Sequence, residues 1–296
     1  KEDMDHYFSA MNSINKAHLL MLLRQGIIGQ EAGKRLAQEL AQMSALSGSD
    51  LDLSAAREDL YYNLEAYLIS RLGVEVAGQL HTGRSRNDLY ATASRIKVRD
   101  IYFRICRSVL DLLAGVLGIA TSEVNTVAPG YTHTQPAEPI TLGHYFAGIA
   151  EAMERDYGRL EDAYPRLNLC PLGAGAMAGT SFGLDRQLVA QYLGFDGIVE
   201  NTLDAVASRD YLIELLANFA ILMTTVGRLA QDLYLWSTDE FRAIEIDDSV
   251  AASSSIMPQK KNPVTLEHVK AKAGHINGAL ISALCVLKGT PFGHCR

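Results

Sequence analysis

Proline is scarce and unevenly placed in this chain of 296 residues. Eight prolines occur, none of them before Pro129 and none between Pro171 and Pro258. Because proline breaks helix interiors, these proline-free stretches permit long helices. Apolar residues inside them step by three and four, as one helix face requires, over Ile101–Ile119 and Leu212–Leu233. We find no convincing run of alternating β-branched residues, so the sequence predicts an all-α fold.

Cysteine, positive charge and long apolar runs are also in short supply. The four cysteines show no CxxC or CxxH spacing, which argues against a disulfide framework and for reduced thiols. Lys and Arg number 27 against 34 Asp and Glu, and the net charge of −7 disfavours nucleic acid or an anionic membrane as partner. No run approaches about 18 uninterrupted apolar residues, and no secretory signal opens the chain. We therefore expect a soluble cytoplasmic protein.

The two long helices carry apolar faces wider than a narrow stripe, so each needs cover on several sides. A helix bundle supplies part of that cover and subunit association the remainder, so we expect a homo-oligomer. Residues 1–80 carry shorter helices, interrupted near Gly26 and at Ser47–Asp50. The sequence predicts a small helical domain at residues 1–85 and a helix-bundle domain at residues 86–296, and we expect both chain ends to be trimmed.

The polar segment His81–Asp88, which reads HTGRSRND, directly precedes the first long helix. Asn87 or Asp88 could cap this helix, since both side chains accept hydrogen bonds from helix N-termini. Alternatively, the Arg86 guanidinium binds a substrate carboxylate through two parallel hydrogen bonds, while the Asn87 amide donates a further hydrogen bond. The residues alone favour neither interpretation.

A second polar segment, Gly130–Pro139, reads GYTHTQPAEP. Its prolines and Gly130 predict a rigid non-helical loop that leads into a helix from about Ile140. His133, next to a hydroxyl, suits proton transfer because the unperturbed pKa of histidine lies near about 6.5. The alternative is an exposed loop histidine without a chemical role.

The third segment, Ser253–Pro263, reads SSSIMPQKKNP. Pro258 and Pro263 exclude a continuous helix or a central strand, so we expect a loop. Its polar groups can converge only around an anion; the alternative is a solvated surface loop. Pro263 also suits the first turn of a helix, which would place the Glu267 carboxylate near that helix N-terminus.

An anionic substrate needs a local cationic pocket in a chain of negative net charge. Basic side chains cluster in two of these segments, as Arg84 with Arg86 and as Lys260 with Lys261. We therefore expect these two places to meet the substrate.

The three segments resemble, in the same order, motifs of the argininosuccinate lyases within the fumarase/aspartase superfamily. HTGRSRND matches residue for residue, and the others are similar to GYTHxQxAxP and to the signature loop GSSxMPxKxNP. Leu172–Thr180 is similar to LGxGALAGT, and Asn201–Asp210 to NSxDAVSDRD. A dinucleotide-binding loop is not indicated at Leu172–Thr180, because the spacing is GxGxxxG and we expect no strand before it.

The resemblance implies β-elimination from an N-substituted succinate, which releases fumarate and an amine. Argininosuccinate, giving arginine and fumarate in arginine biosynthesis, is the leading substrate. The resemblance makes Ser254 the proton-abstracting base, with its oxyanion stabilised by Lys260. His133, held by Glu267, then protonates the leaving nitrogen, although histidine as the base stays an open alternative.

The same resemblance implies no cofactor, no metal, and a homotetramer whose active sites draw segments from three subunits. The partner is then a small N-succinyl dicarboxylate. The residues expected to contact it are Ser85, Arg86, Asn87, Thr132, Arg209, Ser255, Gln259 and Asn262.

Several positions depart from the argininosuccinate lyase pattern. Ser253 replaces the usual glycine of the signature loop, Tyr61 the histidine of EDxH, Glu138 a glutamine, and His294 the tyrosine of KGxPxxY. Residues expected to contact the amine lie partly beyond Arg296. Two alternatives therefore stay open: a lyase for another N-substituted aspartate, such as ethylenediamine disuccinate, and a recruited structural protein like the lens crystallins. Adenylosuccinate lyase fits less well, because the HTGRSRND segment argues against it.

Overall fold

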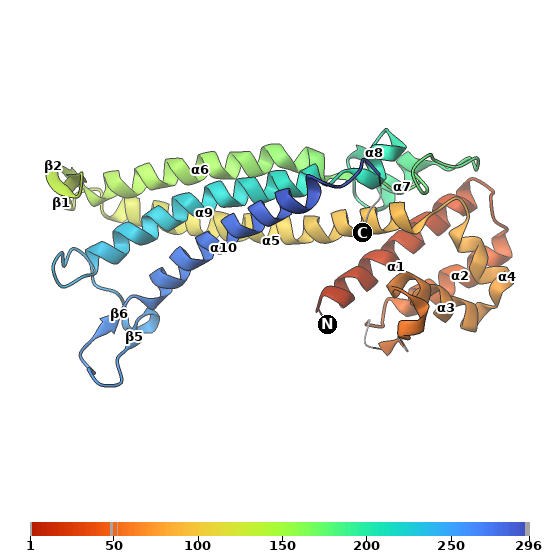
Figure 1. The fold of residues 1–296 in the computed structure, drawn as a ribbon, viewed down its shortest axis with the longest axis horizontal. Coiled ribbons are helices and arrows are strands. Elements are labelled where there is room, and N and C mark those ends of the chain that lie inside the picture. Colours follow the sequence, from red (N-terminus) through yellow and green to blue (C-terminus); the bar gives the residue numbers. More distant parts are fainter. Residues whose placement is uncertain (1, 48–49, 52, 294–296) are drawn as a thin grey trace. The chain divides into compact units, whose positions relative to one another are not determined.

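The computed structural model describes residues 2–47, 50–51 and 53–293. Long helices dominate this part of the chain, and the strands form small two-stranded sheets (Figure 1). The all-α prediction is therefore confirmed. The chain divides into two compact units, one of Lys1–Phe103, Pro165–Arg209 and Thr290–Arg296, the other of Arg104–Tyr164 and Asp210–Gly289.

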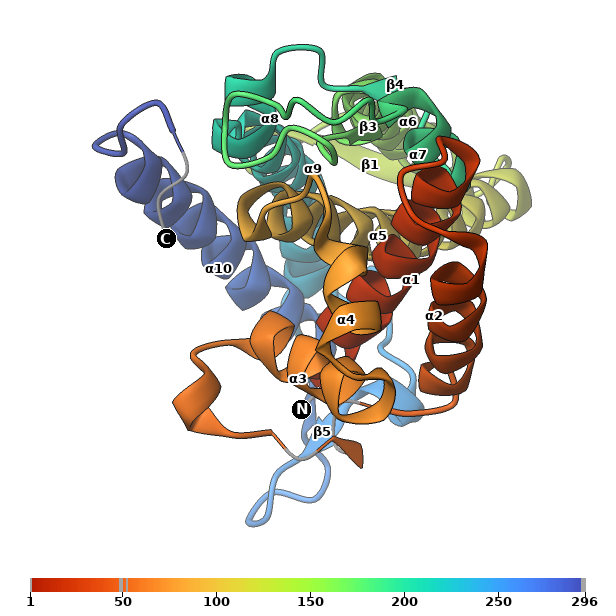
Figure 2. The same cartoon turned by 90° about the vertical axis from the view of Figure 1, so that its right-hand side faces the viewer.

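The helices of the first unit pack around one apolar core. Its elements are α1 (Glu2–Arg24), α2 (Gln30–Met43), η2 (Ala55–Arg57), α3 (Leu60–Leu72), α4 (Val74–Ala77), η3 (Gly78–His81), the start of α5 (Arg86–Ser122), β3 (Leu169–Cys170), α7 (Arg186–Tyr192), β4 (Gly197–Ile198) and α8 (Thr202–Ala207). Figure 2 shows α1, α2, α3 and α4 of this unit. Met11, Ile14 and Leu36 are fully buried in the core. Gly26 separates α1 from α2 with a φ of 67°, as the predicted break there requires.

The second unit is a bundle of long helices. Its elements are the remainder of α5, β1 (Val127–Thr132), β2 (Gln135–Thr141), α6 (Leu142–Leu167), α9 (Asp210–Trp236), η4 (Asp248–Val250), β5 (Ala252–Ser253), β6 (Lys261–Asn262) and α10 (Val264–Leu287). Val116, Phe146, Met153 and Leu229 form a core that joins α5, α6 and α9. The two predicted long helices lie inside α5 and α9, and both predictions are confirmed.

Much of the apolar surface of this bundle is uncovered in a single chain. Among the described residues, α5 and α9 are long and apolar enough to cross a membrane by length and composition alone, a test that core helices of soluble proteins also pass. Only 17% and 22% of these apolar stretches are buried. Exposed apolar side chains include Leu110 and Leu117 on α5 and Ile281 and Val286 on α10.

The domain division expected at residues 85 and 86 stays a proposal. Helix α5 begins in the first unit and ends in the second, so packing alone does not show which part folds independently.

Two local expectations were wrong. The segment expected as a rigid loop is an antiparallel hairpin, in which β1 pairs with β2 from Val127↔Thr141 to Thr132↔Gln135, and α6 begins at Leu142. A two-residue strand, β3, also precedes the glycine-rich segment, and it pairs in parallel with β4. The β3–β4 pair is only two residues long, and the strands of the β1–β2 hairpin are mostly exposed on both faces, so neither pair shows an alternating apolar pattern.

Candidate active site

Ser85, and not Asn87 or Asp88, accepts the first hydrogen bond of α5. The helix begins at Arg86, and the backbone N–H of Asn87 donates to Ser85 Oγ at 3.2 Å. Ser85 is therefore the N-cap residue, and Asp88, at the third helical position, accepts from the Ser85 backbone N–H as in a capping box, whereas Asn87 does not cap the helix. The Asn87 amide instead donates from Nδ2 to the carbonyl of Ala176 at 3.0 Å.

The Asp88 carboxylate joins this turn to the glycine-rich loop. Its Oδ1 accepts from the backbone N–H of Ser85 at 3.0 Å, and its Oδ2 accepts from Gly173 and Gly175 at 2.9 Å each. The side chain is 0% exposed. Burial raises the pKa of Asp88 to about 6, against the opposing influence of these N–H donors and of Arg84. The sequence pattern marked Asp88 only as a possible helix cap.

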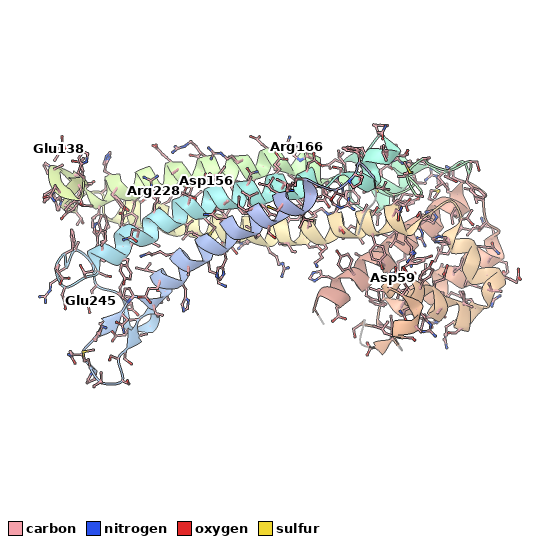
Figure 3. The ribbon with its side chains drawn as sticks, viewed as in Figure 1. Asp59, Glu138, Asp156, Arg166, Arg228 and Glu245 are labelled. Atoms are coloured by element: carbon pink, nitrogen blue, oxygen red, sulfur yellow. The ribbon has the colours of Figure 1, made fainter. Side chains whose placement is uncertain are left out.

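Both arginines of the first cationic cluster have partners within the chain. Arg86 Nη1 lies 2.7 Å from Asp59 Oδ2 and 3.3 Å from Glu58 Oε1, and the guanidinium stacks 4.3 Å from the ring centre of Tyr62 (Asp59 is labelled in Figure 3). Arg84 is only 7% exposed and donates to Asn15 Oδ1 at 2.8 Å. Arg84 is therefore a buried structural cation, and Arg86 must exchange or share its partners to bind a substrate carboxylate.

Tyr61, the departure from EDxH, is buried beside the same turn. Its hydroxyl lies 2.5 Å from His81 Nδ1 and donates to Glu65 at 3.2 Å. Burial, reinforced by Arg84 and Arg86, lowers the pKa of His81 to about 4, so this ring is neutral at pH 7. Tyr61 therefore supports the HTGRSRND segment from within the first unit. His294, the other departure of this kind, lies outside the described residues.

The β1–β2 hairpin presents Thr132 and His133 at its tip. Thr132 pairs with Gln135, which leaves His133 and Thr134 as a two-residue turn with φ values of 52° and 59°. Positive φ at both central residues is the signature of a type I′ turn. His133 is exposed, as expected of a histidine available for proton transfer or of one without a role.

The signature segment is itself a hairpin-like loop. Ser253 pairs with Lys261 across β5 and β6, and the loop between them carries Ser254 and Lys260. Ser254 Oγ accepts from the backbone N–H of Met257 at 3.2 Å.

Lys261 is held by two carboxylates outside the signature segment. Its Nζ lies 2.7 Å from Asp248 Oδ1 and 2.8 Å from Glu245 Oε1 (Figure 3 labels Glu245). These hydrogen bonds raise the pKa of Lys261 above its usual range, and the bond to Asp248 contributes most. Within the described residues, the Lys260 side chain makes no such bond, so Lys260 is the lysine of this pair that is available to an anion.

A pocket of about 950 Å³ collects four of the predicted site residues, namely Gln259, Lys260, Asn262 and Glu267. Glu267 lies in the first turn of α10, as predicted, and accepts from the Tyr234 hydroxyl at 3.5 Å. Within the described part of one chain, no hydrogen bond joins Glu267 to His133. Thr132 lines a different pocket, which shares no residue with this one.

The other eight predicted residues, among them Ser254 and His133, do not line this pocket. Arg209 lies in the first unit and donates to the carbonyls of Val206 and Ser208, at 3.2 and 2.7 Å. Ser255 is exposed on the signature loop.

Comparisons with known proteins agree with these motifs. A model of the lyase family matches residues 14–278. Argininosuccinate lyase 1 of Shouchella clausii is 46% identical over the whole chain, which spans 59% of that protein, and argininosuccinate lyase of Methanosarcina barkeri is 42% identical over 98% of the chain and 58% of its own length. The chain thus spans about three fifths of these curated relatives.

Solved structures give the same result. The structure of EDDS lyase in complex with formate superposes with a TM-score of 0.93 at 38% identity, over 99% of this chain and 58% of the other. A 3-carboxy-cis,cis-muconate lactonizing enzyme from Pseudomonas putida, at 21% identity and a TM-score of 0.78, shares the fold, over 99% of this chain and 65% of its own. The chain therefore belongs to the lyase family, and within the fumarase/aspartase superfamily it is similar to the argininosuccinate lyases.

Proposed function

We propose that the protein is a carbon–nitrogen lyase that eliminates fumarate from an N-substituted succinate, with argininosuccinate as the substrate and arginine as the amine product. The single observation that carries this proposal is the pocket that collects Lys260, Asn262 and Glu267 around the signature loop. The Lys260 ammonium and the Asn262 amide both donate hydrogen bonds and suit a substrate carboxylate. The relatives named argininosuccinate lyase, at 41–46% identity, support the choice of substrate.

In this proposal, Ser254 removes the proton from the carbon beside a carboxylate. The electron pair of the broken C–H bond forms the carbon–carbon double bond, and the carbon–nitrogen bond breaks. Negative charge that gathers on the carboxylate is stabilised by Lys260 and Asn262, while His133 protonates the leaving nitrogen. Closure of the signature loop excludes water while this occurs.

The separation of His133 from Glu267 within one chain supports a composite site. If Glu267 orients His133, the two residues belong to different subunits, and the remaining substrate contacts, Ser85, Asn87 and Arg86, come from the first unit. The uncovered apolar faces of α5 and α10 are suited to the helix packing of such a homotetramer. The compartment proposed is the cytoplasm, and arginine biosynthesis the pathway.

Release of fumarate from argininosuccinate, followed by ultraviolet absorbance, tests this function. We expect turnover that is lost in Ser254→Ala while the oligomer is retained. A Ser254→Ala protein with near-normal turnover would remove Ser254 from the mechanism. Because the EDDS lyase structure superposes closely, the second candidate is addition of a diamine to fumarate, which is assayed in the reverse direction. Inactivity in both directions would favour a structural protein.

A further inference from the structure

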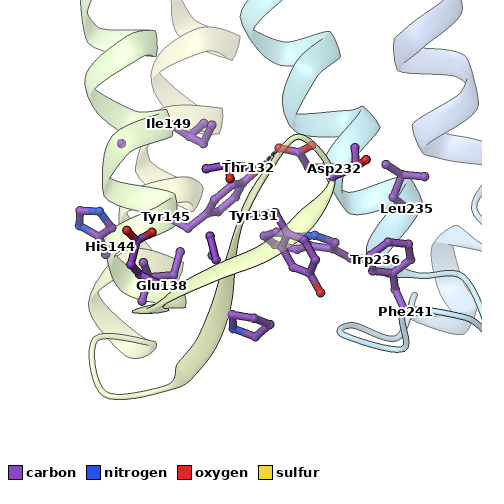
Figure 4. Close-up of a pocket in the computed structure, with 16 residues that line it drawn as sticks. Tyr131, Thr132, Glu138, His144, Tyr145, Ile149, Asp232, Leu235, Trp236 and Phe241 are labelled. Carbon is purple, nitrogen blue, oxygen red and sulfur yellow. Dashed lines mark hydrogen bonds between the residues drawn. The ribbon is translucent and has the colours of Figure 1, made fainter.

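A second pocket lies beneath the β1–β2 hairpin, against the start of α6 and the end of α9 (Figure 4). Its volume is about 550 Å³, which is in the range of sites for small molecules. Apart from Thr132, it contains none of the residues expected to contact the substrate, and it shares no residue with the signature-loop pocket. Apart from Thr132, the side chains that line this cavity have no role in the proposed elimination.

The walls of this pocket are aromatic. Tyr145 and Trp236 have ring centres 4.6 Å apart, and Tyr131 and Phe241 have ring centres 5.8 Å apart (Figure 4). Four rings around one cavity offer several π faces, and the negative face of an aromatic ring attracts a cation.

Negative charge is placed among these rings. Asp232 Oδ2 accepts from the Tyr145 hydroxyl at 2.7 Å, and within the described residues its Oδ1 accepts no hydrogen bond. Glu138 adds a second carboxylate, and among the described residues that line the pocket His144 is the one basic side chain, with no Lys or Arg. Arg228, one turn earlier on α9, acts on Tyr145 electrostatically but is not a lining residue. An anionic group would be repelled here, whereas a cation would find both a free carboxylate oxygen and ring faces.

We propose that this pocket binds a small organic cation with a guanidinium or ammonium group, held by Asp232 and by the rings of Tyr131, Tyr145, Trp236 and Phe241. A guanidinium fits best, because it is planar, stacks on aromatic faces and donates two parallel hydrogen bonds to a carboxylate. The proposal does not rest on the elimination reaction, since binding of the cation needs no turnover.

The chain contains its own reporter for this site. Trp236 is the only tryptophan among these 296 residues, so the intrinsic tryptophan fluorescence of this chain comes from the pocket. We would titrate this 296-residue chain with L-arginine as the guanidinium probe and with L-citrulline, its uncharged isostere. We expect saturable fluorescence change with arginine and none with citrulline over the same range.

Asp232→Asn keeps the shape of the side chain and removes its charge, so it should weaken arginine binding about tenfold or more, because charge-assisted hydrogen bonds are the stronger kind. Glu214→Gln removes the same charge from α9 outside the pocket and should bind arginine normally. If Asp232→Asn does not assemble, Phe241→Leu, at a ring that is 40% exposed, should weaken binding about two- to fivefold.

Three results would overturn the proposal: no response to arginine, an equal response to citrulline, or an arginine response that is unchanged in Asp232→Asn. The last result would locate arginine at another site. Where binding is found, competition in Ser254→Ala with an N-succinyl analogue that cannot undergo elimination identifies the source of the cation. Mutual exclusion marks the amine end of the substrate, and simultaneous binding marks a separate effector.

Discussion

Asp88 Oδ2 lies 2.9 Å from the backbone nitrogen of Gly173, which is 85 residues further along the chain. The same oxygen accepts from Gly175, and the other carboxylate oxygen accepts from Ser85. One buried side chain therefore sets the position of the turn that carries Ser85 and Asn87 relative to the glycine-rich loop. If this turn binds a substrate carboxylate, Asp88 is its positioning residue.

Asp88→Asn should raise the KM for argininosuccinate about tenfold while kcat changes less. An amide provides one acceptor oxygen and turns an N–H donor toward another N–H donor, which loosens the turn. In the wild type, KM should rise below pH 6, because burial raises the pKa of Asp88 to about 6 and its protonation replaces an acceptor. Arg84 and Cys170 are the ionisable neighbours of this carboxyl.

Asp185→Asn is the matched control, because Asp185 caps α7 through the backbone N–H of Leu188 and, within the described residues, makes no hydrogen bond to the turn. Initial rates over a range of pH measure both variants. If the two substitutions raise KM equally, Asp88 has no specific positioning role. The same conclusion follows if KM still rises below pH 6 in Asp88→Asn.

Gly175→Ala should disturb the same loop more than Gly179→Ala. Both glycines have positive φ, 62° and 77°, so each alanine carries a similar backbone strain of about 1 kcal/mol. Only at Gly175 would the new Cβ collide with backbone, at 2.7 Å from the carbonyl oxygen of Gly179; at Gly179 the nearest atom is 3.8 Å away. The free energy of unfolding should therefore fall further in Gly175→Ala, and equal values from urea titration would contradict this account.

The sequence predicted this region well where the chemistry is local. Helix α5 begins within the segment HTGRSRND, at Arg86, close to the predicted start, and Glu267 lies in the first turn of α10, because cap and proline preferences act within a few residues. The role of Asp88 could not be predicted in this way. Its partners are backbone N–H groups far along the chain, and backbone groups leave no mark in the sequence.

The hairpin that carries His133 was misread for a related reason. Pro129 pairs with Pro139 in a two-stranded ribbon, where each strand has a free edge and proline is tolerated. The turn itself is made by His133 and Thr134, without the Asn-Gly or Gly-Gly pair that normally signals positive φ. The aromatic pocket beneath was also missed, because Tyr145, Asp232 and Trp236 meet only through the packing of α6 on α9.

The buried histidine His18 should make the protein sensitive to acid. Burial, reinforced by Arg84, lowers its pKa to about 3, against about 6.5 in the unfolded chain. Between about pH 6.5 and pH 3 the histidine is protonated in the unfolded chain but neutral in the folded one. The folded state therefore has its full stability above about pH 6.5 and loses stability as the pH falls toward 3. Between pH 7 and pH 5, protonation of this residue in the unfolded state should lower the free energy of unfolding by about 2 kcal/mol.

His18→Gln removes the titrating ring and retains a donor for the carbonyl of Thr82, which His18 Nε2 reaches at 3.0 Å. Urea unfolding at both pH values should show a smaller acid loss in this variant than in the wild type. His268→Gln, which removes an exposed histidine, should leave the loss unchanged. The same acid loss in all three proteins would mean that His18 is not the group responsible.

Lys261→Met should loosen the signature loop without touching the groups proposed for chemistry. The Lys261 ammonium forms ion pairs with Glu245 and Asp248 and so ties both carboxylates to β6. Its neighbours in the chain, Lys260 and Asn262, line the signature-loop pocket. Because exposed ion pairs are screened by salt, the wild-type kcat/KM should fall toward that of Lys261→Met as ionic strength rises. Lys34→Met, on the exposed face of α2, removes the same charge elsewhere and should retain wild-type salt dependence. Limited proteolysis should cut residues 253–262 faster in Lys261→Met alone, and equal cleavage of both variants would separate Lys261 from the order of the loop.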